Sequence, residues 1–368
     1  MNTGGDEILE IVKEKGSSDQ RYYPSRVLIK FKNEEIKDTI SNKIGSSTFN
    51  NGTSEVALQL LSSEHKNLTD VLNLEVFAVS QSWNEGTGRY SNLPTSSNGV
   101  SWVFRDNDIT QTQWTTSSFA SATTGSINAS GITEGGGVWY TGSAFQGSQQ
   151  FLRGDNLDTN INVTSIVQKH SASLFANSTY PTGIFNHGFL IKQPDANEFV
   201  NTQANTTIFR YFSIDTHTIY PPELEFRYND YTFDTGSSTN TVLPQVESFI
   251  SIYNNEGTYY SESVPRLRFA AMPKYPDRVF LTASLYNTNY YLPESQSLYA
   301  VKDTETNEFV IDFDSEYTRI SADTTSSYFD LYCNGLEPER YYTILIKTTI
   351  GGVTKVFDEN IMFKVAKG

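Results

Sequence analysis

The sequence predicts an all-β protein that folds as two β-sandwich domains. Apolar and polar residues alternate in short runs such as Arg26–Phe31, Leu74–Val79 and Glu223–Tyr228, which is typical of half-buried strands. The chain holds 22 Tyr and 23 Phe, residues that suit a pleated surface. Gly, Asn, Ser and Pro interrupt the runs at short intervals, as expected for sandwiches.

Helix signals are sparse in the sequence. Residues 6–15 contain Glu and Lys, but Gly4-Gly5 and Gly16-Ser17-Ser18 bracket too short a segment for a helix. The sequence therefore favours a strand over residues 6–15. A short helix is predicted around Val163–Lys169, because the Thr164 hydroxyl can cap it.

Residues 84–150 are rich in Gly, Ser, Thr and Asn and are predicted to form long loops. The tryptophans of the chain lie in or next to this region, at Trp83, Trp102, Trp114 and Trp139. They have two interpretations. They anchor the loops on the sandwich, or they form a stacking platform for sugar rings or an interface hot spot.

The polar segment Asp234–Thr241, with Gly236 and two serines, has the composition of a linker. The predicted domains are therefore residues 1–233 and residues 243–368, joined by a linker over residues 234–242. Repeats of a fixed period are absent from the sequence, which argues against a solenoid or a propeller.

Composition limits the partners that we expect. The net charge of −15 disfavours nucleic acid, and the sequence has no run of Lys and Arg. No basic leader and no long apolar run is visible, so neither a membrane nor a secretion signal is expected. The only cysteine, Cys333, lies in an alternating segment and is predicted to be a small buried residue.

The motifs of common enzymes are missing from the sequence. It has no Gly-x-Ser-x-Gly elbow and no phosphate loop, and Gly86-Thr87-Gly88 stops short of Gly-x-Gly-x-x-Gly. The four histidines are far apart and form no zinc motif. Glu85, two residues after Trp83, is the one carboxylate to inspect for a glycosidase, and a conformational role in a glycine-rich loop is the alternative. We therefore expect that this chain is not an enzyme.

Two oxygen-rich segments are candidates for calcium binding, Asp106-Asn107-Asp108 and Asp155-Asn156-Leu157-Asp158. Neither has the glycine and glutamate positions of an EF-hand loop. Asp and Asn also bond their own backbone in turns, which explains both segments without an ion. No cofactor is expected, and a structural calcium is the less favoured alternative.

An ordered series of short segments resembles the DNRLRE-type domains of bacterial surface proteins and phage particles. Each segment alone is weakly specific, but together they run from Asn2 to Asp230. The segments are Asn2-Thr3-Gly4, Ile8–Ile11, Arg26–Phe31, Leu58-Gln59-Leu60, Val76–Val79, Trp83–Gly88, Gly99–Trp102, Val163–Val167, Gly188–Lys192 and Pro222–Tyr228.

The resemblance implies a jelly-roll-like sandwich, and the sequence departs from it at one point. The chain opens within the Asn-x-Gly loop, so residues for the first strand of the pattern are missing. Either the domain tolerates this loss, or a neighbouring chain adds a strand beside Ile8–Val12.

The C-terminal segment resembles a fibronectin type III or immunoglobulin-like sandwich. Leu336, Pro338 and Tyr342 have the spacing of a tyrosine corner, in which the tyrosine hydroxyl folds back onto the chain just upstream. Strand-like runs follow at residues 343–347, 354–357 and 361–365.

Such a pair of domains resembles tailed-phage structural proteins. The resemblance implies a non-enzymatic virion component (tail, neck, baseplate or capsid surface) assembled in the host cytoplasm. Its partners would be other virion proteins, in a homo-oligomer or a symmetric assembly. The expected anchors are the four tryptophans, with Tyr259-Tyr260 and Tyr290-Tyr291 as sheet or interface residues. The alternative is a carbohydrate-binding module on a virion or cell surface, and a depolymerase is a third, least favoured class.

Overall fold

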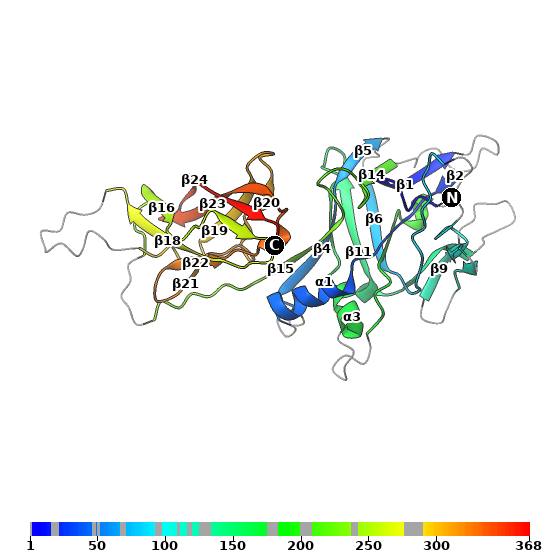
Figure 1. Cartoon of the computed structure of the whole chain (residues 1–368), viewed down its shortest axis with the longest axis horizontal. Coiled ribbons are helices and arrows are strands. Elements are labelled where there is room, and N and C mark those ends of the chain that lie inside the picture. Colours follow the sequence, from blue (N-terminus) through cyan, green and yellow to red (C-terminus); the bar gives the residue numbers. More distant parts are fainter. Residues whose placement is uncertain are drawn as a thin grey trace, which may run out of the picture. The chain divides into compact units, whose positions relative to one another are not determined.

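The structure is a computed structural model, and it divides the chain into two compact units, Met1–Arg227 and Tyr228–Gly368 (Figure 1). The residues that it describes are 2–15, 22–45, 49, 52–66, 71–92, 98–108, 111–115, 120–124, 134–174, 183–198, 208–236, 242–275 and 290–368. Both units are built mainly from antiparallel strands, so the predicted all-β class is confirmed. The finer division into a jelly roll and an immunoglobulin-like sandwich stays a prediction.

The first unit has two four-stranded sheets. One has the order β2 (Tyr22–Pro24), β1 (Ile8–Lys15), β14 (Ile208–Phe212) and β5 (Ser62–Lys66). The other has the order β11 (Gln146–Leu152), β6 (Val71–Ala78), β13 (Phe189–Lys192) and β3 (Val27–Ile29). The ring centroids of Phe151 on β11 and Phe209 on β14 lie 6.1 Å apart, so the two sheets share a core.

Smaller sheets complete the first unit. A three-stranded sheet has the order β12 (Thr159–Asn162), β4 (Ser54–Leu60) and β15 (Glu223–Tyr228). Two-stranded ladders join β9 (Ala120–Thr124) to β10 (Glu134–Tyr140) and β7 (Phe104–Asp106) to β8 (Thr112–Gln113).

Residues 8–15 form strand β1, as the sequence favoured over a helix. Ile11 and Val12 are buried, and β14 pairs with Ile8–Val12 along one side. On the other side β2 pairs only with Lys13–Lys15, and the hydroxyl of Ser25 bonds the Val12 N–H and the Glu10 carbonyl. In the described part of the chain, no strand therefore pairs with Ile8–Glu10 on this side. A strand donated by a neighbour stays a prediction.

The predicted helix is present as α3 (Thr164–Leu174). The Thr164 hydroxyl accepts the N–H of Val56 on β4, and the Thr164 N–H donates to the side-chain oxygen of Asn162. The sequence did not predict α1 (Asn33–Asp38) with the following π-helical segment η1 (Thr39–Ile44), or the short α4 (Asp195–Glu198). In α1 and η1, Ile36, Ile40 and Ile44 recur every four residues and are buried, and this periodicity was the available signal. One-turn 3₁₀ segments also occur, η2 (Ser143–Phe145) and η5 (Cys333–Gly335).

The second unit has two sheets around one core. A four-stranded sheet has the order β16 (Ser248–Ile252), β18 (Arg266–Pro273), β22 (Ser327–Asp330) and β21 (Ser321–Ala322). A five-stranded sheet has the order β17 (Thr258–Tyr260), β24 (Val353–Ala366), β23 (Arg340–Ile350), β19 (Ser297–Asp303) and β20 (Phe309–Ile311). Phe269, Phe329, Tyr342 and Phe363 are among the buried residues of the core.

The segment after Arg227 belongs to the second unit. The Ala322 carbonyl on β21 accepts the Asp234 N–H, and the Ala322 N–H donates to the Thr232 carbonyl. The division between Arg227 and Tyr228 thus precedes the boundary at residue 233 that the sequence suggested. Of the predicted linker, residues 237–241 lie outside the described residues.

Candidate functional site

The tryptophans gather in one part of the first unit. Trp114 and Trp139 are each 5 % exposed and share a core cluster with Val79, Val138 and Leu190. Trp83 packs against the same cluster and is half-buried, and its indole N–H donates to the His187 carbonyl at 2.7 Å. Their packing is that of loop anchors.

Trp102 is held by a cation. The guanidinium carbon of Arg26 lies 4.6 Å from the centre of the Trp102 ring and 5.5 Å from that of Trp139. A platform for sugar rings needs an exposed ring face. Only Trp83 and Trp102 keep partial exposure, and one face of Trp102 already carries Arg26.

Arg26 also begins a network of buried charges that sequence reasoning missed. It bonds the Glu198 carboxylate through Nε and Nη2, the latter at 2.6 Å, and it donates to the Gly136 carbonyl at 2.7 Å. Lys192 lies 2.6 Å from Asp195 and 3.8 Å from Glu198. The side chains of Arg26, Glu198 and Lys192 are at most 4 % exposed.

These buried charges compensate one another. A charge taken out of water is tolerated only when it is paired and hydrogen-bonded. Arg26 and Lys192 face Glu198, and Glu75 adds a carboxylate oxygen 3.5 Å from Lys192. The network therefore fixes α4 to β3 and β13, and we assign it a structural role. The sequence held one signal of this network, because Arg26 directly precedes the apolar strand β3 and Lys192 ends the apolar strand β13.

Asn2 joins the start of the chain to the glycine-rich loop at residues 84–88. Its amide donates to the carbonyls of Glu85 and Val100 at 2.6 and 2.8 Å, and its oxygen accepts the N–H groups of Gly4 and Gly88. A Cβ on Gly88 would lie 2.2 Å from the Asn2 carbonyl. This close approach gives the Asn-x-Gly and Gly-Thr-Gly segments a physical reason.

Glu85 belongs to the same contact through its backbone. Desolvation raises the pKa of the Glu85 carboxyl, and the charge of Asp215 adds to the rise. Its carbonyl accepts the Asn2 amide, and a Cβ on Gly4 would lie 2.4 Å from that oxygen. The contacts of Glu85 therefore favour the conformational interpretation over the glycosidase one.

The oxygen-rich segments make the turn contacts that the sequence suggested. The Asp106 carboxylate accepts the Asp108 N–H at 3.0 Å, and the Asn156 oxygen accepts the Asp158 N–H at 3.2 Å. Asp158 also accepts the Ser62 N–H at 2.7 Å. Among the described residues, no group of three or more His, Cys, Asp or Glu side chains is placed to hold a metal ion.

His170 on α3 is fully buried, and its burial was not predicted from the sequence. Its ring lies edge-on to Phe189, with centroids 5.7 Å apart. Burial lowers the pKa of His170 to about 3, with a smaller contribution from His187. His217 is 92 % exposed at the side chain, and the side chain of His65 lies outside the described residues.

Tyr342 in the second unit makes the contact of a tyrosine corner. It is 1 % exposed, and its hydroxyl donates to the carbonyl of Glu337 at 2.9 Å. Cys333 is fully buried nearby in the same core. Neighbouring strand residues point to opposite faces, and accordingly Tyr259 is buried whereas Tyr260 is 63 % exposed. Tyr291 of the other tyrosine pair is buried as well.

Large apolar side chains are exposed on both sheets of the second unit. On the four-stranded sheet, Phe249 is 57 % exposed, Tyr253 53 % and Met272 40 %, and we call these the β16–β18 face. On the five-stranded sheet, exposed apolar side chains come from β17, β23 and β24. These are Tyr260, Tyr341 and Met362, which we call the β23–β24 face. Several exposed apolar residues on one surface mark an interaction site better than a single one does.

Sequence reasoning missed Phe249, Tyr253, Tyr341, Met272 and Met362. A signal was present in Ser248–Ile252, where apolar residues occupy both faces of the strand instead of one.

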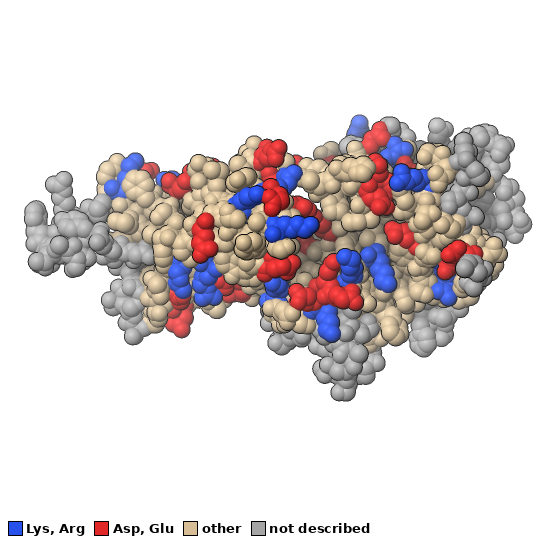
Figure 2. All heavy atoms as spheres, in the orientation of Figure 1, with Lys and Arg blue, Asp and Glu red and all other residues tan. Residues whose placement is uncertain are grey.

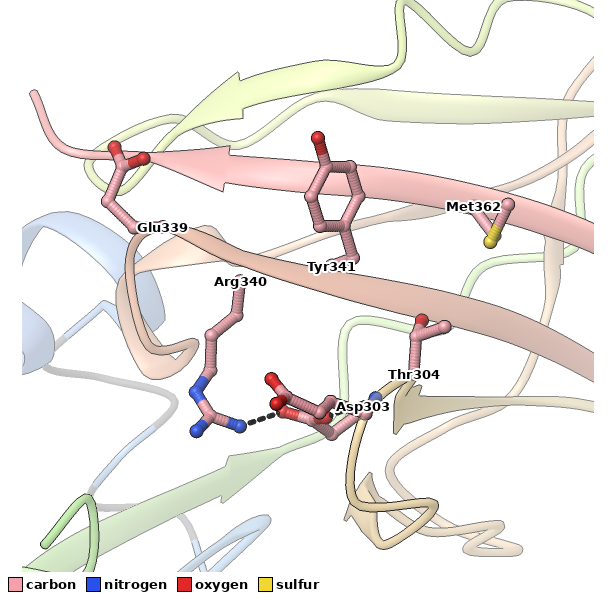
Figure 3. Close-up of a pocket in the computed structure, with 7 residues that line it drawn as sticks. Asp303, Thr304, Glu339, Arg340, Tyr341 and Met362 are labelled. Atoms are coloured by element: carbon pink, nitrogen blue, oxygen red, sulfur yellow. Dashed lines mark hydrogen bonds and ion pairs between the residues drawn. The ribbon is translucent and has the colours of Figure 1, made fainter.

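The β23–β24 face borders an open depression of about 350 Å³. Figure 3 shows Tyr341 and Met362 along one side of it and the paired Arg340 and Asp303 at one end. Asp303 is further held by the N–H groups of Glu305 and Thr306. The charges of Arg340 and Asp303 thus compensate each other, and Tyr341 and Met362 form an apolar wall of the depression.

Charged side chains of both signs are interspersed on the face of the molecule seen in Figure 2. No continuous basic area appears on that face. Among the described residues, no helix is long and apolar enough to cross a bilayer.

Comparison with known proteins returned no relatives: no family model, no curated protein and no solved structure matches this chain.

Proposed function

We propose that this chain is a non-enzymatic structural component of a tailed-phage virion that acts through protein–protein contacts. The segments from Asn2 to Asp230 that resemble DNRLRE-type domains, and the fibronectin-like C-terminal pattern, support this class. The observation that carries the proposal is the placement of apolar side chains. Trp114 and Trp139 are buried in the first unit and Trp83 and Trp102 are partly buried there, whereas the second unit presents Tyr260, Tyr341 and Met362 outward.

Such exposed residues cost free energy in water unless a partner covers them. Burial of an aromatic or Met side chain contributes about 1.5–3 kcal/mol. Interface energy usually concentrates in a few aromatic anchors, and tyrosine is among the commonest. The β23–β24 face therefore serves best as a protein contact in an assembled particle.

The test is incorporation into particles. Virions purified from the source of the sequence are analysed by quantitative mass spectrometry, and the chain is expected at a fixed copy number relative to the major capsid protein. A Tyr341→Ser/Met362→Ser double variant is expected to reduce incorporation at least tenfold, because two buried apolar anchors would be lost. Tyr90→Ser, at a tyrosine 62 % exposed in the first unit, is the matched control.

Other outcomes point elsewhere. Absence from purified particles would contradict the proposal. Binding on a glycan array that is lost in Trp83→Ala or Trp102→Ala would replace it with the carbohydrate-binding function, and polysaccharide turnover lost in Glu85→Gln would replace it with a depolymerase.

A further inference from the structure

Strand β16 is the outermost strand of its sheet (Figure 1). Phe249 pairs with Met272, and Ser251 pairs with Ala270. The Glu247 carbonyl accepts the Lys274 N–H, and the Tyr253 N–H donates to the Arg268 carbonyl. Residues alternate in an antiparallel strand, so the odd-numbered residues 247–253 direct their N–H and C=O groups to β18. Ser248, Ile250 and Ile252 direct theirs to the other side.

On that other side β16 has no hydrogen-bonded neighbour strand among the described residues, and β24 of the five-stranded sheet packs against β16. Within the described part of the chain, no hydrogen bond reaches the N–H or C=O of Ile250 or Ile252. The strand contains no Pro, no charged residue and no bulge, which are the usual protections of a sheet edge. The opposite edge of the same sheet differs, because Thr232 and Asp234 bond to Ala322 on β21.

We propose that β16 pairs antiparallel with β16 of a second copy of this chain, about a two-fold axis through Ile250. The inference deepens the proposed structural role and rests on it. In this register Ile250 faces Ile250 of the second copy, and Ser248 faces Ile252. It is the symmetric register in which all three edge-facing residues find a partner. The two sheets then form one continuous sheet.

The side chains on the β16–β18 face suit this pairing. Phe249 lies directly opposite Ser251 of the second copy, and Tyr253 of that copy follows at the next position on the same face. The exposed Phe249, Tyr253 and Met272 of both copies thereby form one apolar band across the seam. Phe249 and Tyr253 of the second copy are diagonal neighbours in this register, about 7–8 Å apart, which is within reach of aromatic side chains.

Charge favours a second copy over a basic partner. The whole chain carries −15, but the β16–β18 face is locally balanced. It holds the pairs Lys274–Glu247, Arg268–Asp323 and Arg266–Asp330, with separations of 4.0, 2.7 and 2.8 Å. A like copy therefore meets little repulsion. The register also places Glu247 opposite Tyr253 of the second copy, whose neighbour on β18 is Arg268.

The register can be trapped by disulfides. Phe249 and Ser251 of two copies form a non-hydrogen-bonded pair, with Cα atoms about 4.5 Å apart, which a disulfide can span. Each residue lies about 7–8 Å from its own equivalent, beyond that reach. An oxidised mixture of Phe249→Cys and Ser251→Cys chains is thus expected to give several-fold more covalent dimer than either variant alone. Both positions are exposed, and Cys333 is fully buried.

A mixture of Ser251→Cys with Tyr260→Cys is the control, because Tyr260 is 63 % exposed but lies on the other sheet. Equal trapping in all samples, or none, would overturn the proposal.

Sedimentation equilibrium of the unaltered full chain provides a second measurement. A reversible monomer–dimer equilibrium is expected, and Glu247→Lys should raise its Kd about fivefold or more by placing two cations at the seam. The thermal midpoint of the monomer should barely change, because Glu247 is 63 % exposed and only 4.0 Å from Lys274. A chain that stays monomeric at all concentrations would overturn the proposal. That result would leave the proposed function intact, because incorporation is tested on particles with variants of the other face.

Discussion

At the residue scale, this protein uses polar groups in its interior as fixed structural parts. Glu198 pairs with Arg26, and the Tyr342 hydroxyl donates to the Glu337 carbonyl. The Asn2 amide makes four hydrogen bonds, three of them to residues 85–100. His170 differs from these groups, because burial keeps it neutral. This residue makes the stability of the first unit depend on pH.

The first unit is expected to lose stability as the pH falls below about 6.5. The pKa of His170 is about 3 in the folded chain and about 6.5 in the unfolded chain, so the unfolded chain binds the proton first. The free energy of unfolding should therefore fall by about 2 kcal/mol between pH 7.5 and 5 from this group. Urea unfolding followed by tryptophan fluorescence measures this, because all four tryptophans lie in the first unit.

The His170→Leu variant should lose this part of the pH dependence, whatever its stability at pH 7.5. His217→Leu, at a side chain that is 92 % exposed, should keep the parent profile. A parent profile that is flat from pH 7.5 to 5 would contradict the assignment.

At the element scale, strands were predictable and close approaches were not. Alternation indicated β3, β6 and β15, because a period of two is visible in a short window of sequence. β1 was indicated by the glycines that bracket too short a segment for a helix. The sequence could not show that Asn2 meets Gly86 and Gly88, since that contact joins loops more than 80 residues apart. The helix α1 spans only six residues, so its periodicity is visible only when Ile40 and Ile44 of the following η1 are read together with Ile36.

Alanine variants of two glycines can distinguish the cost of a left-handed backbone from the cost of a steric contact. Gly52 and Gly86 have nearly the same φ, +78° and +80°, but a Cβ on Gly52 would meet nothing within 4 Å. A Cβ on Gly86 would lie 2.7 Å from the Asn2 side-chain oxygen. Gly52→Ala should cost about 1–2 kcal/mol for the left-handed conformation alone, and Gly86→Ala should cost about 1–3 kcal/mol more.

Tryptophan fluorescence in urea reports both variants, because both glycines belong to the first unit. Equal losses in the two variants would show that Asn2 does not hold the loop in solution.

At the scale of the whole molecule, the chain consists of two units with separate cores. The second unit buries its own cluster, including Leu267, Phe269, Ile344 and Phe363. Composition indicated two domains, and the linker-like segment lay close to the division. Composition could not locate the boundary between the two units, because Thr232 and Asp234 have the polar character of linker residues. Only the structure shows their hydrogen bonds to the second unit.

Residues 228–368 are therefore expected to fold without the first unit. The fragment should show one cooperative unfolding transition by calorimetry, at a midpoint within a few degrees of the second-unit transition of the full chain. A fragment that begins at residue 243 lacks the strand-like contact of Thr232–Asp234 with Ala322 and should melt lower. Equal midpoints for the two fragments would contradict the assignment of residues 228–236 to this unit.

The parallel pairing of β17 with β24 has a mechanical consequence. Thr258–Tyr260 runs beside Lys364–Ala366 in the same direction, so an early strand and the last strand of the second unit are adjacent. A force that pulls the start of this unit and its C-terminus apart would displace the two strands along each other. Their hydrogen bonds would then resist together in shear instead of opening one after another. Such a force would therefore load this strand pair in shear.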